Sequence, residues 1–302
     1  MHSNPLTEPN GSKKFGDMRD YMAPSLFQPH RVRQAIRDAH EKKIPPMIGY
    51  YAGLTSIPIT RFCAPMGYDA VWIDWEHTSC NVETLTTIVH ETAFMSQGRT
   101  IPWVRVPGHD HASIGFALDA GASIVVPQIE TVVQAKYVVS AARFGASRGG
   151  SRSVPPFRYV QGVTDLRIDA DKDIWHNLNE QAAVMIQIES LAGIDNLDDI
   201  LTQVPDIDMV WLGSIDARVS MGLPSRGQEP VWLEAVEKFQ ATVKKHDKPY
   251  AGFAFGPTSN LPKAAAGMSM ALVTSDTEQL MRMKAHLEEA KAVLAITTTE
   301  SG

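Results

Sequence analysis

Cysteine is scarce in this chain of 302 residues, which contains only two. Two cysteines cannot form a disulfide framework, and Cys63 and Cys80 lie in no CxxC pair or other zinc-binding pattern. We therefore expect both to be reduced residues that pack against their neighbours.

Excess positive charge and long hydrophobic runs are also lacking. The formal net charge is −6, which gives no general attraction for nucleic acid or for an anionic membrane. No apolar run approaches the roughly 20 residues of a membrane span. The first thirty residues are polar and lack the apolar segment of a secretory signal. We expect a cytoplasmic protein that binds neither nucleic acid nor membrane.

Apolar runs that alternate with helical patterns are abundant. Strands are predicted at 46–52, 70–74, 102–106, 123–127, 183–188, 208–213, 249–254 and 269–274. These runs are apolar throughout, as expected for a parallel sheet that is covered on both faces. Helices are predicted between them, for example at 31–43, at 82–96 with Asn81 as N-cap, and at 229–246.

Eight strands with intervening helices predict a single (β/α)₈ barrel, the TIM barrel fold of the α/β class. An open, doubly wound sheet is the alternative, but no GxGxxG follows the first strand. We divide the chain into a partly ordered arm at 1–30, a barrel at 31–295 and a C-terminal tail at 296–302.

A long connection at about 143–182 precedes the fifth strand. It contains Arg148, Arg152 and Arg158. Loops of this length in compact domains are usually functional or disordered. The three arginines could therefore meet an acidic ligand, or they could lie in a solvated loop.

Two acidic residues, Glu189 and Asp216, each stand where an apolar run ends and a turn begins. Their separation, 216 − 189 = 27 residues, equals one strand, helix, strand step, so they are predicted at neighbouring strand ends. Two such carboxylates predict a metal site. Helix N-caps or surface carboxylates are the alternative.

Two further strand ends carry charged groups. Asp74, Glu76 and His77 end the second run, and Arg105 ends the third. His77 is the natural proton-transfer residue, with Asp74 placed to orient its ring. The guanidinium fork of Arg105 matches a substrate carboxylate, and Glu76 is expected to support Arg105 or the water shell of the metal. A hydrogen-bonded structural histidine and an ion pair at the barrel rim are the alternatives.

Several motifs occur in an order that resembles the HpcH/HpaI aldolase family, the metal-dependent pyruvate aldolases. The resemblance runs from about residue 45 to about residue 290 and rests on YDAVWIDWEHT, VRVPGHD, ALDAGASIVVPQIET, RFGASRGGSRS, VMIQIES and LGSIDARVSMG. Two of these stretches also resemble the macrophomate synthase branch of the family. The resemblance implies a homo-oligomer, a hexamer or a dimer, in which terminal helices exchange between barrels.

The resemblance also implies a chemistry for these residues. A divalent ion held by Glu189 and Asp216 would stabilise the enolate of pyruvate, while Asp74 and His77 would act as an acid/base dyad through water. Ligation by oxygen alone favours Mg²⁺, and Mn²⁺ or Co²⁺ could replace it.

The turn before the sixth-strand acid is expected to bind the carboxylate of the substrate. Backbone N–H groups of Ile215 and Asp216 can face an anion there. The family has proline where this chain has Ser214, and Arg218 is expected to bring a cation close to the site.

Two glutamines complete the candidate substrate contacts. Gln128 at the fourth strand end could hydrogen-bond an acceptor carbonyl, although an amide cannot act as a general acid. Gln187 is expected on the same side of its strand as Glu189, where it contacts substrate or metal-bound water, or simply joins two strands as a buried amide.

We therefore expect a divalent-metal-dependent carbon–carbon lyase that acts on pyruvate, oxaloacetate or a 4-hydroxy-2-oxo acid. It would form the pyruvate enolate by retro-aldol cleavage, by oxaloacetate decarboxylation, or by both. The alternatives are decarboxylative carbon–carbon bond formation of the macrophomate synthase type, cleavage of a coenzyme A thioester of the citrate lyase β type, and a barrel that binds a 2-oxo acid without turnover.

Overall fold

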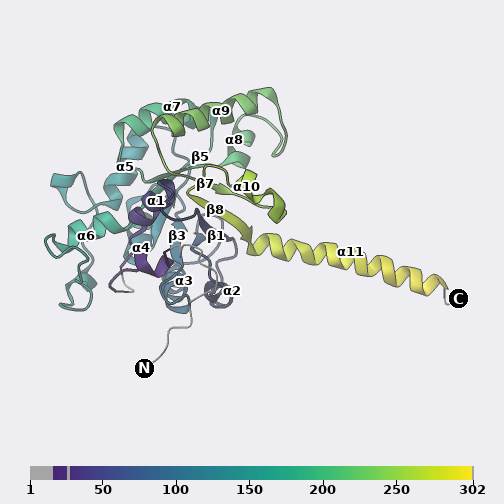
Figure 1. Ribbon diagram of the computed structural model, residues 1–302, viewed down its shortest axis with the longest axis horizontal. Helices are drawn as coiled ribbons and strands as arrows, with labels where there is room; N and C mark the ends of the chain where they lie inside the picture. Colours follow the sequence, from purple (N-terminus) through teal and green to yellow (C-terminus); the bar gives the residue numbers. More distant parts are fainter. Residues whose placement is uncertain (1–15, 26–27, 301–302) are drawn as a thin grey trace.

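The computed structural model describes residues 16–25 and 28–300 and is built on a closed barrel of eight parallel strands in sequence order (Figure 1). The strands are β1 Met47–Ala52, β2 Ala70–Asp74, β3 Ile101–Arg105, β4 Ser123–Val126, β5 Val184–Ile188, β6 Met209–Leu212, β7 Tyr250–Phe253 and β8 Met270–Ser275. β8 pairs with β1 and closes the barrel. The predicted TIM barrel is confirmed, and the predicted strand ends are correct to within one or two residues.

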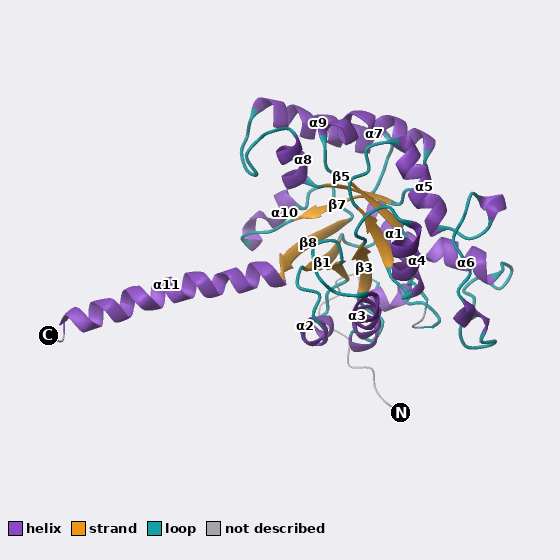
Figure 2. Cartoon of the chain, turned by 180° about the vertical axis from the view of Figure 1, so that it is seen from behind, coloured by secondary structure: helices purple, strands orange, loops and turns teal. Residues whose placement is uncertain are grey.

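Helices surround the strands (Figure 2). They are α1 Val32–His40, α2 Ile57–Cys63, α3 Val82–Met95, α4 His111–Asp119, α5 Val132–Ala142, α6 Ile174–Gln181, α7 Leu191–Gln203, α8 Ser214–Ser220, α9 Pro230–Lys245, α10 Leu261–Ala264 and α11 Asp276–Glu300. Local sequence explains several of their starts. Asn81 caps α3 as predicted, because its side chain accepts a hydrogen bond from the N–H of Thr84 at 2.8 Å.

The inside of the barrel is filled with side chains and is closed at the N-terminal ends of the strands. Trp72, Trp103 and Trp211 are almost fully buried inside the barrel. Ile36 of α1 and Met18 of the arm belong to the same apolar cluster. Because this end is plugged, a ligand can reach the strands only at their C-terminal ends, as in other (β/α)₈ barrels.

The connection before β5 is more regular than the sequence suggested, and the last helix runs further than the predicted barrel boundary. The segment 143–182 is not a loop throughout, because it contains α6 and two short 3₁₀ turns, Ala146–Arg148 and Pro156–Tyr159. Residues 296–300, which the sequence assigned to a C-terminal tail, continue α11. Residues 1–15 of the predicted arm lie outside the described part of the chain.

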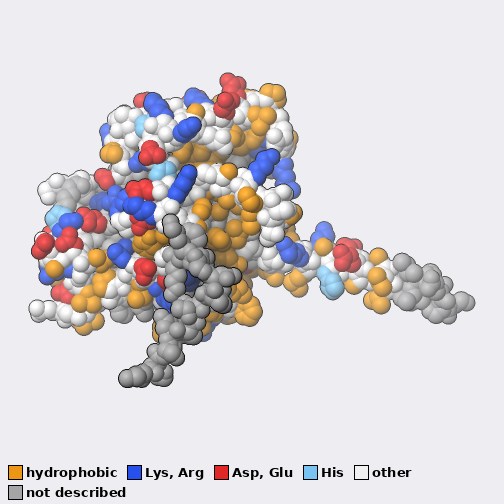
Figure 3. All heavy atoms as spheres, in the orientation of Figure 1, with side chains coloured by type: hydrophobic (Ala, Val, Ile, Leu, Met, Phe, Trp, Pro, Cys, Tyr) orange, Lys and Arg blue, Asp and Glu red, His pale blue; other side chains and the backbone are white. Residues whose placement is uncertain are grey.

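The last helix, α11, points away from the barrel instead of packing on it (Figures 1 and 2). A groove of about 420 Å³ lies beside its start, lined by Tyr50, Phe62, Met66 and Leu280 among others. Hydrophobic side chains gather on this face of the barrel (Figure 3). Helix α11 therefore leaves apolar surface next to β1 and β8 that it does not cover itself.

The structure bears on the two cysteines and on the expected absence of a membrane span. Cys63 and Cys80 are free thiols, and both are partly buried, as expected. Within residues 16–25 and 28–300, no helix is both long enough and apolar enough to cross a membrane.

Candidate active site

Four strand ends bring the predicted charged residues to one mouth of the barrel. Asp74 ends β2 and Arg105 ends β3, and the two are register neighbours. Glu189 directly follows β5, and Asp216 lies in the first turn of α8, directly after β6. Because the C-terminal ends of parallel strands meet at one rim, residues far apart in sequence form one site.

Glu189 is buried, and the backbone around it is shaped to hold it. The N–H of Gln128 donates to its Oε2 at 2.8 Å, and Nε2 of Gln187 donates to its Oε1 at 3.0 Å. A Cβ on Gly213 would lie 2.4 Å from Oε1, so only glycine leaves room for this carboxylate. Gln128 has φ 54°, a left-handed conformation that is costly for a residue other than glycine. This strained conformation points the N–H of Gln128 at the carboxylate of Glu189.

Negative charge accumulates around Glu189. Burial raises the pKa of Glu189 to about 7, and the charges of Asp216 and Glu76 act in the same direction. Burial also raises the pKa of Glu76, with smaller contributions of the same sign from Asp74 and Asp216. Arg105 opposes both shifts without cancelling them. A cation placed among these carboxylates would relieve their repulsion and would favour their ionised forms.

The donor set fits a hard divalent ion. All of the candidate donors are oxygens, and Oε1 of Gln187 is buried without a hydrogen-bond partner in the part of the chain that the structure describes. No cluster of three or more His, Cys, Asp or Glu side chains suited to a metal occurs among the same residues. Two carboxylates, Glu189 and Asp216, could therefore hold the ion and leave coordination positions for a substrate and for water.

Arg105 forms a buried ion pair with Asp74. Its Nε lies 3.0 Å from Oδ1 of Asp74, and its Nη2 lies 2.7 Å from Oδ2. Nε is also 3.2 Å from Oε2 of Glu76. Although burial alone would raise the pKa of Asp74, the Arg105 guanidinium holds it below its usual value. The two nitrogens of Arg105 that were expected to bind a substrate carboxylate are thus already paired with Asp74 and Glu76. The remaining nitrogen, Nη1, has no hydrogen bond to the described residues.

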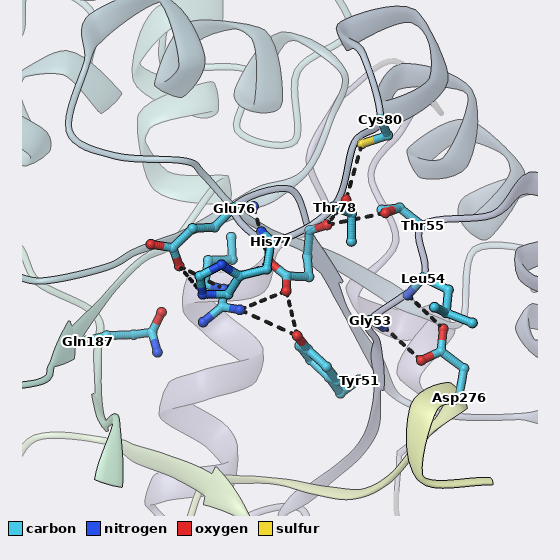
Figure 4. A network of polar contacts seen from close by, with 12 residues as sticks. Tyr51, Gly53, Leu54, Thr55, Glu76, His77, Thr78, Cys80, Gln187 and Asp276 are labelled. Atoms are coloured by element: carbon cyan, nitrogen blue, oxygen red, sulfur yellow. Dashed lines mark hydrogen bonds and ion pairs between the residues drawn. The ribbon is translucent and has the colours of Figure 1, made fainter. Parts of the chain in front are cut away.

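His77 stands at the rim of the site. Its side chain is 65% exposed, and Nε2 lies 3.7 Å from Oε2 of Glu76 (Figure 4). Asp74 accepts from the backbone N–H of His77 at 3.3 Å and directs its carboxylate at Arg105. The expected contact between Asp74 and the imidazole is not formed, and Glu76 is the carboxylate beside the ring.

The predicted substrate contacts on turns lie at the same mouth. Ser214, Ile215 and Asp216 form the exposed first turn of α8, whose backbone N–H groups have no acceptor within the helix. The side chain of Gln128 is exposed beyond β4, while its backbone serves Glu189. The roles of these residues in binding a substrate remain predictions.

Arg218 does not bring a cation to the site, and the prediction that it would is wrong. Its guanidinium is buried and turns towards the following loop, where it donates to the carbonyl oxygen of Pro224 at 2.7 Å and to Glu229 at 2.6 Å. It also lies over the ring of Trp232. Arg218 therefore fixes the loop between α8 and α9.

Tyr51 belongs to the site and was not predicted. Its hydroxyl donates to Oδ2 of Asp74 at 2.5 Å and lies 3.4 Å from Nη2 of Arg105 (Figure 4). Successive side chains of β1 point alternately outward and inward, and this alternation could have placed Tyr51 inside the barrel. Tyr50 belongs to the apolar cluster around the barrel, whereas Tyr51 packs on the cluster within it. The apolar character of the whole strand concealed that alternation.

Aromatic rings form one wall of the site. Phe253, at the end of β7, packs edge-on against Tyr51 and Trp211, with ring centroids 5.8 and 4.8 Å apart. Phe255 lies against Phe253 at 4.6 Å. Phe253 and Phe255 are 43% and 39% exposed, so the charged cluster borders an accessible apolar surface.

A (β/α)₈ barrel with charged groups gathered at the C-terminal ends of its strands has the architecture of an enzyme active site. Residues 47–282 match the HpcH/HpaI aldolase/citrate lyase model, and the chain belongs to this family. The family comprises pyruvate-type aldolases that act on 2-oxo acids, typically with a divalent metal ion.

Three relatives illustrate the family. The chain is 33% identical to a 4-hydroxy-2-oxovalerate aldolase of Novosphingobium aromaticivorans over 59% of its length and 64% of that protein's length. It is 31% identical to a 4-hydroxy-2-oxo-heptane-1,7-dioate aldolase of Salmonella arizonae, over 72% and 79% of the two chains. The crystal structure of macrophomate synthase superposes with a TM-score of 0.83 at 30% sequence identity. The match covers 90% of this chain and 93% of that chain.

Replacing Tyr51 by phenylalanine should lower kcat by about tenfold while the fold is retained, because a hydrogen bond to a charged group contributes roughly 1.5–3 kcal/mol. The loss should fall on kcat more than on KM, since Tyr51 acts by positioning Asp74 and Arg105. Tyr50→Phe is the matched control, because the Tyr50 hydroxyl is buried without a hydrogen-bond partner among the described residues. Equal losses in both variants would contradict the assignment.

Proposed function

We propose that this chain is a divalent-metal-dependent carbon–carbon lyase that forms the enolate of pyruvate. Its reactions are the retro-aldol cleavage of a 4-hydroxy-2-oxo acid and the decarboxylation of oxaloacetate. The supporting observation is Glu189, a buried carboxylate with a pKa of about 7 that feels the charges of Asp216 and Glu76 beside the unpartnered oxygen of Gln187. Such an arrangement is costly unless a cation joins it.

Glu189 and Asp216 would hold the cation, with Mg²⁺ expected and Mn²⁺ or Co²⁺ as substitutes. When bound, the ion supplies Lewis-acid stabilisation of the negative charge that develops on the 2-oxo acid. The first-turn N–H groups of Ile215 and Asp216 bind the substrate carboxylate. Nη1 of Arg105 donates to the oxygen on which the enolate charge develops.

His77 transfers the proton of the aldol hydroxyl. In the cleavage direction it accepts the proton from the oxygen on C4, the bond between C3 and C4 breaks, and the electron pair moves into the enolate. The proton held by His77 then passes through water to C3, which gives pyruvate and regenerates the base. Glu76, 3.7 Å from the ring, stabilises the imidazolium formed in the first step.

Decarboxylative carbon–carbon bond formation is the second candidate, supported by the similarity to macrophomate synthase. It uses the same enolate, so the two proposals differ only in the electrophile. Gln128 stands at the fourth strand end and can hydrogen-bond a carbonyl, but it cannot donate a proton as a general acid.

Exchange of deuterium from solvent into the methyl group of pyruvate tests enolate formation. We expect exchange only in the presence of Mg²⁺ or Mn²⁺, and we expect Glu189→Gln and Asp216→Asn to reduce it by at least about 10³-fold. NMR of enzyme treated with EDTA, before and after metal addition, measures the exchange.

At limiting metal, exchange should increase from about pH 6 to about pH 8, because protonated Glu189 cannot bind the ion.

Asp195→Asn is the control, since Asp195 pairs with Lys238 on the outer helices. It should exchange pyruvate at the rate of the unmodified protein. Metal-independent exchange, or full activity in either of the two carboxylate variants, would disprove the assigned metal site.

His77→Ala should impair retro-aldol cleavage at least about 10²-fold and oxaloacetate decarboxylation far less. The reason is that loss of CO₂ requires no base to remove an alcohol proton. Steady-state rates for a 4-hydroxy-2-oxo acid and for oxaloacetate, measured on the same preparation, give the ratio. Equal losses in the two reactions would exclude His77 as the proton-transfer group.

The aromatic wall indicates which kind of aldehyde the site can accommodate as the second product. Arg105 is paired with two carboxylates and Arg218 turns away, so neither offers a free cation to a second carboxylate on the substrate. Phe253 and Phe255 instead offer apolar surface. We propose that the aldehyde carries an uncharged apolar or aromatic group.

A 4-hydroxy-2-oxo acid with a phenyl group on C4 should therefore have a kcat/KM at least about tenfold above that of 4-hydroxy-2-oxo-heptane-1,7-dioate. Phe253→Ala should reduce the ratio of kcat/KM for the phenyl substrate to kcat/KM for the dioate. Phe94→Ala, on the exposed side of α3, should leave that ratio unchanged. A preference for the dioate in the unmodified enzyme would refute the proposal.

We also propose a homo-oligomer, a dimer or a hexamer, in which α11 of one protomer covers the groove beside β1 and β8 of another. Helix α11 carries the exposed side chains of Leu280, Met281, Met283 and Leu287. The groove is apolar and lies where a barrel helix normally covers the strands. An exchanged helix would bury both surfaces.

Met281→Glu should shift the sedimentation coefficient towards that of the monomer, because a charge would enter the apolar contact. Lys284→Glu, at an exposed charged position of the same helix, is the control and should leave the assembly unchanged. Sedimentation velocity at several protein concentrations measures both. An unmodified protein that sediments as a monomer would contradict the proposal.

A further inference from the structure

A cavity of about 580 Å³ lies on the outer wall of the barrel, and none of the strand-end residues of the active site lines it. It is enclosed by α3, by the end of α4 and by residues 153–164 of the connection before β5. Its walls are mostly apolar and include Phe116, Val154, Phe157 and Val160, with Asp119 as a charged member. A cavity of this volume suits a small organic ligand.

Arg158 does not itself line this cavity, but it lies directly behind the lining residue Phe157 and is the unusual group of the region. Its side chain is almost completely buried, with 1% of the residue exposed. Nε, Nη1 and Nη2 all lack a hydrogen-bond partner among the residues that the structure describes. The guanidinium lies over the ring of Phe157, 5.1 Å from its centroid, and Phe157 lines the cavity. A buried cation without a partner is strongly unfavourable.

The surrounding charges do not compensate for Arg158. Asp119 is already paired with Arg152, whose Nη2 lies 2.6 Å from its Oδ1. Burial lowers the pKa of Arg158 to about 10, and the nearby charge of Arg152 lowers it further than Asp119 restores it. Arg158 is still protonated at neutral pH. Two guanidinium groups therefore share one carboxylate, and one positive charge is uncompensated.

We propose that this cavity binds a small organic anion, a carboxylate attached to an apolar body. The carboxylate pairs with Arg158, whose planar guanidinium can donate two parallel hydrogen bonds to it. The apolar body lies among Phe116, Val154 and Val160. Phe157 lies between the cavity and the guanidinium and is 42% exposed, so its ring must turn outward when the carboxylate reaches Arg158.

The composition of the cavity selects this class of ligand. One uncompensated positive charge matches a single carboxylate better than a phosphate or a nucleotide, which would bring two or more negative charges beside Asp119. The largely apolar walls require a hydrophobic body, so acetate alone should bind weakly. The site contains none of the strand-end residues and is separate from the catalytic centre.

Calorimetric titration of the full-length, metal-loaded enzyme tests the proposal with four probes. Benzoate and hexanoate carry both features, benzyl alcohol keeps the apolar body without the charge, and acetate keeps the charge without the body. We expect benzoate and hexanoate to bind with one site per chain, and the other two probes at least about tenfold more weakly. Pyruvate methyl exchange, followed in parallel, reports occupancy of the active site.

Arg158→Met should abolish binding of benzoate and hexanoate and leave pyruvate methyl exchange intact. Without ligand, its melting temperature should equal or exceed that of the unmodified protein, because an unpaired buried charge has been removed. Arg226→Met, at an exposed position, is the control and should bind normally. Thr86→Trp, which fills the cavity from α3, provides a second test that leaves Arg158 in place.

Three results would overturn the proposal. Benzyl alcohol that matches benzoate in affinity would leave an apolar cavity without a role for Arg158. Benzoate binding that survives in Arg158→Met or in Thr86→Trp would place the ligand elsewhere. Binding that inhibits pyruvate exchange competitively with pyruvate would assign the anion to the active site.

Discussion

The burial of Glu189 beside the carboxylates of Glu76 and Asp216, at one end of the barrel, is the constraint on which the rest of the site depends. Glu189 is held in place by the N–H of Gln128, by the amide of Gln187 and by the absence of a side chain on Gly213. Arg105 neutralises part of the charge but is committed to Asp74 and Glu76. The fold thus maintains an excess of negative charge at a site that water and substrate can reach. A divalent ion is the simplest partner for such a site.

The barrel and its strand-end acids could be predicted from sequence because both leave local signals. Apolar runs of strand length at regular intervals define the barrel, and a carboxylate directly after such a run points to the rim. Glu189, Asp216, Asp74 and Arg105 are all found there, as expected.

The contacts between side chains were not predictable in the same way. The contact of His77 with Glu76, the turn of Arg218 towards Glu229 and the hydroxyl of Tyr51 on Asp74 depend on side-chain directions that no spacing encodes. The helical tail beyond residue 295 was missed because its threonines weaken the helix signal. Arg152 and Arg158 were expected either to meet an acidic ligand or to lie in a solvated loop, and only the packing of the connection on α3 and α4 separates them from the active site.

Anomalous diffraction from crystals soaked in Mn²⁺ tests the central claim most directly. The account predicts one strong peak per chain, in contact with the carboxylates of Glu189 and Asp216, and no such peak in crystals of Glu189→Gln. A peak at another position, or none at Mn²⁺ concentrations that support pyruvate exchange, would contradict it.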